Sequence, residues 1–321
     1  MSTATLPVPV IFNHSAAIDD FVATALLLSM PNVELKGIVV TNADCVADPA
    51  MEVSWMVHQF FGLEHIPLTL SNARGWNAFP WEYRSDCIRM AGIDILKPFS
   101  KNVQWPPYPS GEDMLVDLLR AAIRDQRPVK ILATGPITAV TNVVKADKSL
   151  LAGIGEIIWM GGAIDVPGNL DPKSIPLQIA NTHAEWNAFW DPTAVADMFE
   201  LFSKVRIFPL DITDKARITP GFIASLKAQQ QYPYSDFVYQ AYALVTDEPF
   251  YEMWNTCATT YLAGRDDIFA PPELAVLSME QYGFEQGWIQ RSAGKGSQQE
   301  IYLDLASPQN FYDYILQQLK K

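Results

Sequence analysis

Residues 8 to 20, Val-Pro-Val-Ile-Phe-Asn-His-Ser-Ala-Ala-Ile-Asp-Asp, decide the fold class of this chain. The apolar run Val8–Phe12 is typical of a buried strand, and Asp19 and Asp20 begin an apolar run typical of a helix. Acidic residues in the first turn of a helix complement its dipole and need no further role. Carboxylates at the end of a strand also bind cations or hydroxyl groups. Neutral residues such as Ser15 leave this loop with less charge than a metal-binding loop carries.

Apolar strand-like runs alternate with helix-like runs along the first two thirds of the chain. This rhythm predicts an α/β fold with a mostly parallel central sheet and helices on both faces. We expect strands at Val8–Phe12, Leu35–Val40, Ile66–Leu70, Val129–Ala133, Glu156–Met160, Val205–Pro209 and Gln299–Leu303. We expect helices at Asp19–Met30, Pro49–Phe61, Gly111–Asp125, Ile137–Val144, Pro192–Phe202 and Pro308–Leu319.

The chain after about residue 220 predicts a helical C-terminal flank, formed by Phe222–Lys227 and Ser235–Leu262. No low-complexity linker divides the sequence, so we expect residues 1–321 to form a single domain. The Pro- and aromatic-rich segment Trp76–Pro109 is too long for an ordinary connection. It is either a packed surface loop, or a lid or oligomer contact.

Composition and charge exclude several functions. Of the 321 residues, 49% are hydrophobic, which is enough for a substantial core, and the formal charge of −13 argues against nucleic-acid binding. The N-terminus lacks a signal-peptide pattern and no apolar run could span a membrane, so we expect a cytoplasmic protein without membrane contact. The cysteines Cys45, Cys87 and Cys257 are scattered in sequence, which favours neither a disulfide framework nor a zinc site.

Four motifs at expected strand ends point to one family. They are the opening loop with Asp19-Asp20, the turn Thr134-Gly-Pro136, the turn Met160-Gly-Gly162 and the segment Ala184-Glu-Trp-Asn187. In this order and spacing they resemble the inosine-uridine nucleoside hydrolase family across nearly the whole chain. The resemblance implies hydrolysis of the N-glycosidic bond of nucleosides, a bound calcium ion, and homodimers or homotetramers.

The resemblance also implies roles for individual residues. The family's calcium ligands correspond to Ser15, Asp20, the carbonyl of Thr134 and Asn255. The side chains that contact ribose correspond to Asp19, Glu185 and Asn187.

Three departures from the family pattern affect the metal site. Asn13, Ser15 and Asn255 stand where the family has aspartates, so Asp20 is the only metal-ligating carboxylate left. Because calcium affinity follows ligand charge, we expect calcium to bind weakly or not at all. Ser15 cannot take a proton from water as a carboxylate would, so ordinary nucleoside hydrolysis is not expected.

Further candidates come from the same strand-end segments. As catalytic groups we consider Ser15, Asp19, His14 and His183; the two histidines could donate a proton to a leaving base or could be structural. Additional candidates for substrate contact are Asn42, Asp44, Asn169, Trp186 and Trp254. Asn42 and Asp44 could equally serve a turn or a helix cap.

Two classes of function remain open. One is a nucleosidase-type hydrolase with a modified site. The other is a catalytically inactive protein that keeps the cavity for a nucleoside or sugar-like ligand, or a fold recruited to different chemistry.

Overall fold

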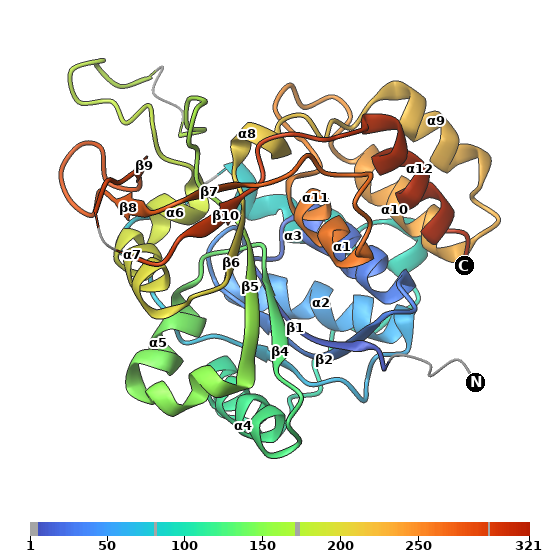
Figure 1. Cartoon of the computed structure of the whole chain (residues 1–321). Helices are drawn as coiled ribbons and strands as arrows, with labels where there is room; N and C mark the ends of the chain where they lie inside the picture. The colour runs from blue at the N-terminus through green and yellow to red at the C-terminus, as the bar shows by residue number, and fades with distance from the viewer. Residues whose placement is uncertain (1–5, 80–81, 171–173, 295) are drawn as a thin grey trace.

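A computed structural model describes residues 6–79, 82–170, 174–294 and 296–321 (Figure 1). Its main sheet has the strand order β3-β2-β1-β4-β5-β6-β10-β7, in which only β7 runs antiparallel to its neighbour. The strands are β1 Val8–His14, β2 Val33–Val40, β3 Leu68–Leu70, β4 Val129–Ala133, β5 Ile154–Met160, β6 Val205–Phe208, β7 Glu273–Ala275 and β10 Gln299–Ile301. The expected mostly parallel sheet is therefore confirmed.

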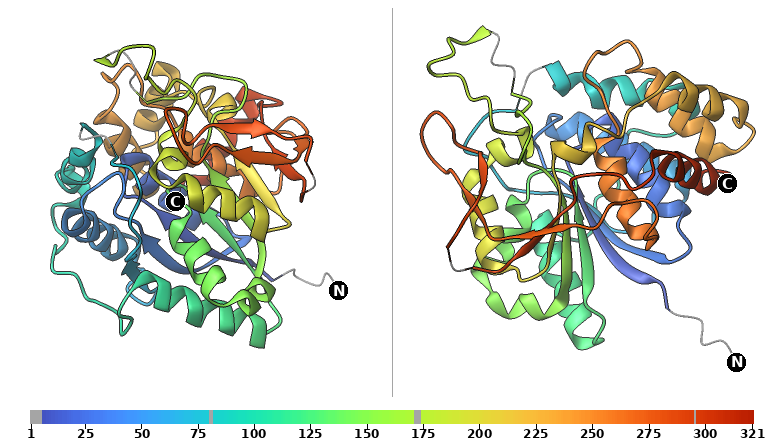
Figure 2. Two further views of the ribbon diagram at one scale, coloured as in Figure 1. Left: turned by 90° about the vertical axis from the view of Figure 1, so that its left-hand side faces the viewer. Right: turned by 45° about the horizontal axis from the view of Figure 1, so that its top comes forward.

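Helices cover both faces of this sheet, as Figure 1 shows. Within the described residues they are α1 Ile18–Ser29, α2 Ala47–Phe61, α3 Asp86–Ala91, α4 Gly111–Arg124, α5 Thr138–Ala146, α6 Trp186–Trp190, α7 Pro192–Leu201, α8 Leu210–Thr213, α9 Pro220–Ala228, α10 Pro233–Ala243, α11 Trp254–Thr260 and α12 Pro308–Gln318. The C-terminal flank consists of α9 and α10, against which α12 closes the chain, and the three lie together in the right-hand view of Figure 2.

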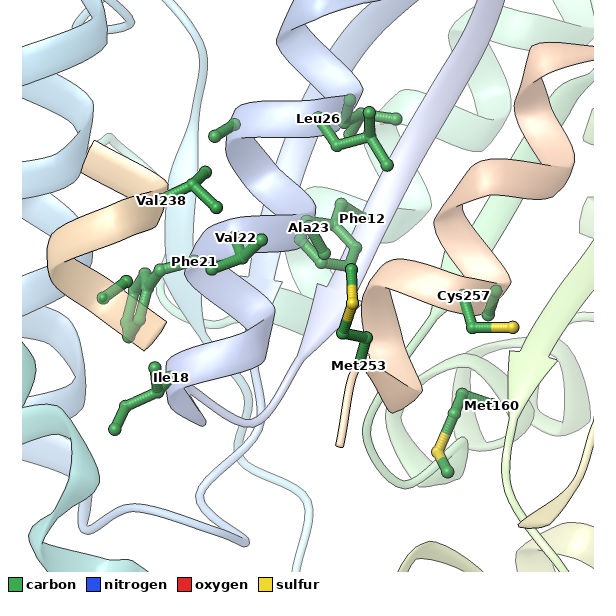
Figure 3. Packing of buried hydrophobic residues seen from close by; sticks show 14 of the residues in the cluster. Phe12, Ile18, Phe21, Val22, Ala23, Leu26, Met160, Val238, Met253 and Cys257 are labelled. Carbon is green, nitrogen blue, oxygen red and sulfur yellow. The ribbon is translucent and has the colours of Figure 1, made fainter. Parts of the chain in front are cut away.

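The alternating direction of the side chains along β1 explains why the sheet has an apolar layer on each face. Val10 and Phe12 belong to the apolar cluster beneath α1, α2 and α10, whereas Ile11 belongs to the cluster beneath α4, α5 and α7. Successive side chains of a strand point to opposite faces, so a continuous apolar run serves both layers. Figure 3 shows the first cluster where Phe12, Leu26 and Met253 bring together β1, α1 and the start of α11.

One expectation about the C-terminal half was wrong, and one element there was not predicted. The continuous helix expected over Ser235–Leu262 ends at Ala243, and helix α11 begins only at Trp254. Pro249 lies between them, and proline cannot supply the backbone N–H that a continuing helix needs. A short hairpin was not predicted from the sequence, because strands of three residues carry almost no periodic signal. It pairs β8 Leu277–Met279 with β9 Ile289–Arg291.

The sheet topology brings the motifs to one edge. Strands β1, β2, β4 and β5 are parallel neighbours, so the loops that follow them leave at the same end of the sheet. Ser15, Thr134 and Met160 come from three of these strand ends, and Tyr251 and Asn255 approach from around the start of α11. This end of the sheet is where open α/β folds bind ligands.

Candidate functional site

A small cavity, a hollow that opens to solvent, lies at this end of the sheet, with about 50 Å³ of free volume between its walls. Its described lining combines strand-end polar groups with aromatic rings: Ser15, Ala17, Asp44, Phe79, Tyr83, Thr134, Met160, Asn169, Glu185, Trp186, Asn187, Tyr251, Trp254 and Asn255. Nine residues expected from the sequence are among them, and three candidates for catalysis, Asp19, His14 and His183, are not.

Asp20 is the centre of a buried hydrogen-bond network. Its Oδ2 atom accepts from the backbone N–H of Ser15 at 3.1 Å and of Ala17 at 2.9 Å, and the Ser15 hydroxyl is 3.5 Å away. Its Oδ1 atom accepts from the Thr134 hydroxyl at 2.6 Å and from the Asn255 side-chain amide at 2.8 Å. Both carboxylate oxygens are therefore occupied by protein donors.

Burial raises the pKa of Asp20 to about 7, although the hydrogen bonds from Thr134 and Ala17 act in the opposite direction. Desolvation disfavours the charged form, whereas donors that face a carboxylate favour it. Among the described residues, no group of three or more His, Cys, Asp or Glu side chains could hold a metal ion.

Asp19 is not among the described lining residues of the cavity, and its side chain joins α1 to α11. Its Oδ2 accepts from the backbone N–H of Asn255 at 2.6 Å and of Thr256 at 3.0 Å, which are orphan donors at the start of α11. The Thr256 and Tyr242 hydroxyls donate to its Oδ1. These contacts give Asp19 a structural role; a ribose contact by this side chain would require the network to open.

Glu185 and Asn187 hold the far wall. Glu185 accepts three backbone N–H bonds, from Gly162 at 2.8 Å, Asn187 at 2.9 Å and Ala188 at 3.2 Å, and so caps α6. Burial raises its pKa to about 7. The Asn187 amide donates to the carbonyls of Thr134 and Met160, both at 3.1 Å. The carbonyl of Thr134 therefore already has a partner.

Aromatic rings form much of the remaining wall. The Trp254 indole N–H donates to Asp214 at 3.1 Å, which fixes the ring, and Trp186 packs against Phe79 with ring centroids 5.4 Å apart. Asn169 accepts from the backbone N–H of Trp186 at 3.1 Å. Rings held by such contacts offer apolar faces to a planar ligand.

The histidines and Asn42 lie outside the cavity lining. His14 is buried and its Nδ1 accepts from the backbone N–H of Ala16 at 3.1 Å; burial lowers its pKa to about 3, so it is neutral near pH 7. His183 stacks on Trp288 with centroids 4.1 Å apart. Asn42, with its amide oriented to satisfy its neighbours, donates to the Cys45 carbonyl and accepts from Arg74.

Asp44 differs from Asn42 because it does line the cavity. Burial, together with the negative charges of Asp86 and Asp20, holds its pKa well above the usual range for an aspartic acid. The protonated form of Asp44, which can donate a hydrogen bond, is therefore favoured more than in an exposed aspartic acid.

Sequence reasoning missed several lining residues. Phe79 and Tyr83 come from the aromatic segment that the sequence marked only as a lid, an oligomer contact or a packed loop. Tyr251 lies just before Trp254, and Met160 ends β5. Their aromatic or apolar character alone predicts core as well as cavity, so only the fold separates these roles.

The fold and the strand-end site define a nucleoside hydrolase-like α/β protein, and comparison with known proteins agrees. The model of the family "Inosine-uridine preferring nucleoside hydrolase" matches residues 10–301, so the chain belongs to this family. This family is known to use calcium. Across the described residues, no helix is both long and apolar enough to cross a bilayer.

Individual relatives cover most of the chain. Non-specific ribonucleoside hydrolase RihC of Escherichia coli (strain SE11) is 24% identical over 304 residues, 92% of this chain and 93% of the relative. Pyrimidine-specific ribonucleoside hydrolase RihA of Klebsiella pneumoniae is 25% identical over 221 residues, 68% of this chain and 65% of the relative. The structure of the inosine-uridine preferring nucleoside hydrolase from Bacillus anthracis is 28% identical with a TM-score of 0.85, covering 98% of this chain and 99% of the other.

Proposed function

We propose that this protein is a calcium-free member of the family that binds a neutral nucleoside-like ligand and does not hydrolyse nucleosides at ordinary enzyme rates. The observation that carries this proposal is the hydrogen bonding of Asp20, whose two carboxylate oxygens accept from protein donors on three sides.

The donor set does not suit a calcium ion. Calcium takes six to eight oxygen ligands at roughly 2.3–2.6 Å and favours carboxylates. Here Asn255 turns its NH₂ group, which cannot be a ligand, toward Asp20. The Thr134 hydroxyl donates to the same carboxylate, and the Thr134 carbonyl accepts from Asn187. We therefore derive no catalytic step through a metal.

Among the residues that the structure describes, the cavity also offers no evident base for activating water. Asp20 and Glu185 are buried carboxylates of the strand-end site, and backbone or side-chain donors occupy the oxygens of both. Burial and the negative charges of Asp86 and Asp20 raise the pKa of Asp44, which favours its protonated form. A general base must be unprotonated and free to accept a proton from the attacking water, and each of these three groups is poorly suited to that role.

The lining instead suits a neutral ligand with a flat ring and hydroxyl groups. Trp186, Trp254 and Tyr251 offer ring faces, and Asp44 and Asn169 offer polar groups. No Lys or Arg is found among the described lining residues, so a phosphorylated ligand would have no cation to pair with. These features favour a nucleoside over a nucleotide.

Calorimetric titration with inosine, uridine and their monophosphates tests this function, with release of free ribose followed in parallel. We expect a nucleoside to bind, its monophosphate to bind at least about tenfold more weakly, and no ribose to appear. Trp254→Ala should abolish binding, whereas Trp105→Ala, at an exposed tryptophan outside the cavity lining, should not change it. Turnover in the usual range of about 1–1000 per second would contradict the proposal.

We further propose, as the sequence predicted, that residues 1–321 act as one domain and assemble as a homodimer or homotetramer in the cytoplasm. Analytical ultracentrifugation of the purified chain tests the assembly: sedimentation as a single monomeric species at micromolar concentration would contradict it.

A further inference from the structure

Two cysteines that are far apart in sequence meet beside the cavity. Cys45 lies in the loop between β2 and α2, and Cys87 lies in the first turn of α3. The backbone N–H of Cys87 donates to the Cys45 sulfur at 3.2 Å, and the two thiols hydrogen-bond to each other. The fold thus turns two scattered cysteines into a pair.

The geometry of the pair is compatible with a covalent bond. A disulfide needs Cα atoms within about 4.4–6.8 Å of each other. The backbone nitrogen of Cys87, which is bonded directly to its Cα, already contacts the Cys45 sulfur. Helices α2 and α3 pack against each other and hold this approach. Because the two residues already touch, we expect side-chain rotation to be the movement that brings the sulfurs together.

We propose that Cys45 and Cys87 form a reversible disulfide when the protein meets a peroxide, which makes this wall of the cavity an oxidation-sensitive site. The proposal does not depend on whether the cavity binds nucleosides. Peroxide fits as the oxidant class because both cysteines are fully buried, so a bulky disulfide such as oxidised glutathione has no direct access.

The chemistry balances with peroxide as the only co-reactant. The Cys87 thiolate attacks one peroxide oxygen, the O–O bond breaks, and a sulfenic acid and a hydroxide form. The hydroxide takes the Cys45 proton, and the Cys45 sulfur then attacks the sulfenic sulfur and displaces a second hydroxide, which takes the remaining proton to form water. Two thiols are oxidised and one peroxide is reduced to two waters.

The surroundings favour Cys87 as the attacking sulfur. The hydrogen bond from the Cys45 thiol lowers the pKa of Cys87, while burial raises the pKa of Cys45. The Cys45 thiol also lies 3.1 Å from the Ala16 carbonyl and 3.6 Å from Asp44, both acceptors for its proton.

The bond would change the cavity wall. Cys45 follows the lining residue Asp44, and Cys87 lies four positions after the lining residue Tyr83. Oxidation links these two parts of the wall and removes the thiol donor from the Ala16 carbonyl in the opening loop. Ligand affinity and the stability of this region should therefore both respond to oxidation.

The test treats the full folded chain with hydrogen peroxide, then blocks free thiols and maps peptides without reduction. We expect a Cys45–Cys87 linked peptide in the wild type and in Cys257→Ser, and none in Cys45→Ser or Cys87→Ser. Cys257 is an equally buried cysteine on α11 and serves as the matched internal control. Dithiothreitol should restore the unlinked peptides.

A second measurement covers the case in which a serine variant folds poorly. Because cross-linking constrains the unfolded chain, the oxidised wild type should melt about 3–6 °C higher than the reduced form, and reduction should reverse the shift. The proposal is overturned if the linked peptide forms only in denaturant, or if Cys257 is cross-linked as readily as this pair.

Discussion

Replacing Asn255 by aspartate tests the network at Asp20 most sharply. The substitution removes the 2.8 Å amide bond and places a second carboxyl group against the first, in a site with no solvent exposure at Asp20. Two adjacent buried carboxylates cannot both stay ionised, so folding must take up one proton.

The size of the expected loss of folding stability follows from proton linkage. An unfolded aspartic acid has a pKa of about 3.9, so keeping one carboxyl protonated at about pH 8 costs roughly 5–6 kcal/mol, and at about pH 5.5 roughly 2 kcal/mol. The folded-state pKa of the pair is raised, so stability is present at low pH and lost as the pH rises. Wild-type Asp20, whose pKa is about 7, itself loses roughly 2 kcal/mol of stability between these two pH values, so relative to wild type Asn255→Asp should lose about 1–1.5 kcal/mol more at the higher pH.

Urea denaturation at these two pH values, in chelator, measures the difference. Asn169→Asp is the matched control, because it adds the same charge at an exposed position of the cavity rim and should shift the unfolding free energy by less than about 0.5 kcal/mol. The reasoning is refuted if Asn255→Asp is as stable as wild type at about pH 8 and shows no added pH dependence.

Two further substitutions test neighbouring contacts. Thr134→Val removes the hydroxyl that donates to Asp20 and should cost about 1–3 kcal/mol in thermal or urea unfolding, whereas Thr24→Val, whose buried hydroxyl bonds only a helix carbonyl, should cost less. His14→Asn should reduce the acid sensitivity of folding: the folded-state pKa of His14 is lowered to about 3, so wild-type stability falls as the pH drops below about 6.5, by about 2–3 kcal/mol at pH 4.5. If the variant lost stability below about pH 6.5 as steeply as wild type, His14 would not be a buried, neutral side chain.

Much of the fold could be predicted because its strands are long apolar runs followed by polar loops. The strand Val129–Ala133 has the predicted bounds, and Val8–His14 extends its prediction by two residues. The short strands β7, β8 and β9 and the interruption before Trp254 were missed, since periodicity needs more residues to become visible and a single proline does not fix where a helix resumes.

The candidate site was predictable in composition more than in contacts. Strand-end motifs brought Ser15, Glu185 and Asn187 to the cavity because parallel strands end at one edge. No pattern could show that the Asn255 amide turns toward Asp20, or that Asp19 bonds the start of α11, because both contacts join segments more than 230 positions apart. The proximity of Cys45 and Cys87, which are 42 positions apart, was also hidden because it depends on how separate segments pack.

Calcium titration of the wild-type protein by calorimetry tests the central claim most directly. Since the inferred ligands bond one another, we expect no stoichiometric heat at calcium concentrations up to about 1 mM, where sensor-type sites with dissociation constants of about 0.1–10 μM would saturate. A double variant, Ser15→Asp with Asn255→Asp, restores two of the family's carboxylates and is the positive control for a regained site. A stoichiometric micromolar isotherm in the wild type that disappears in Asp20→Asn would contradict the account.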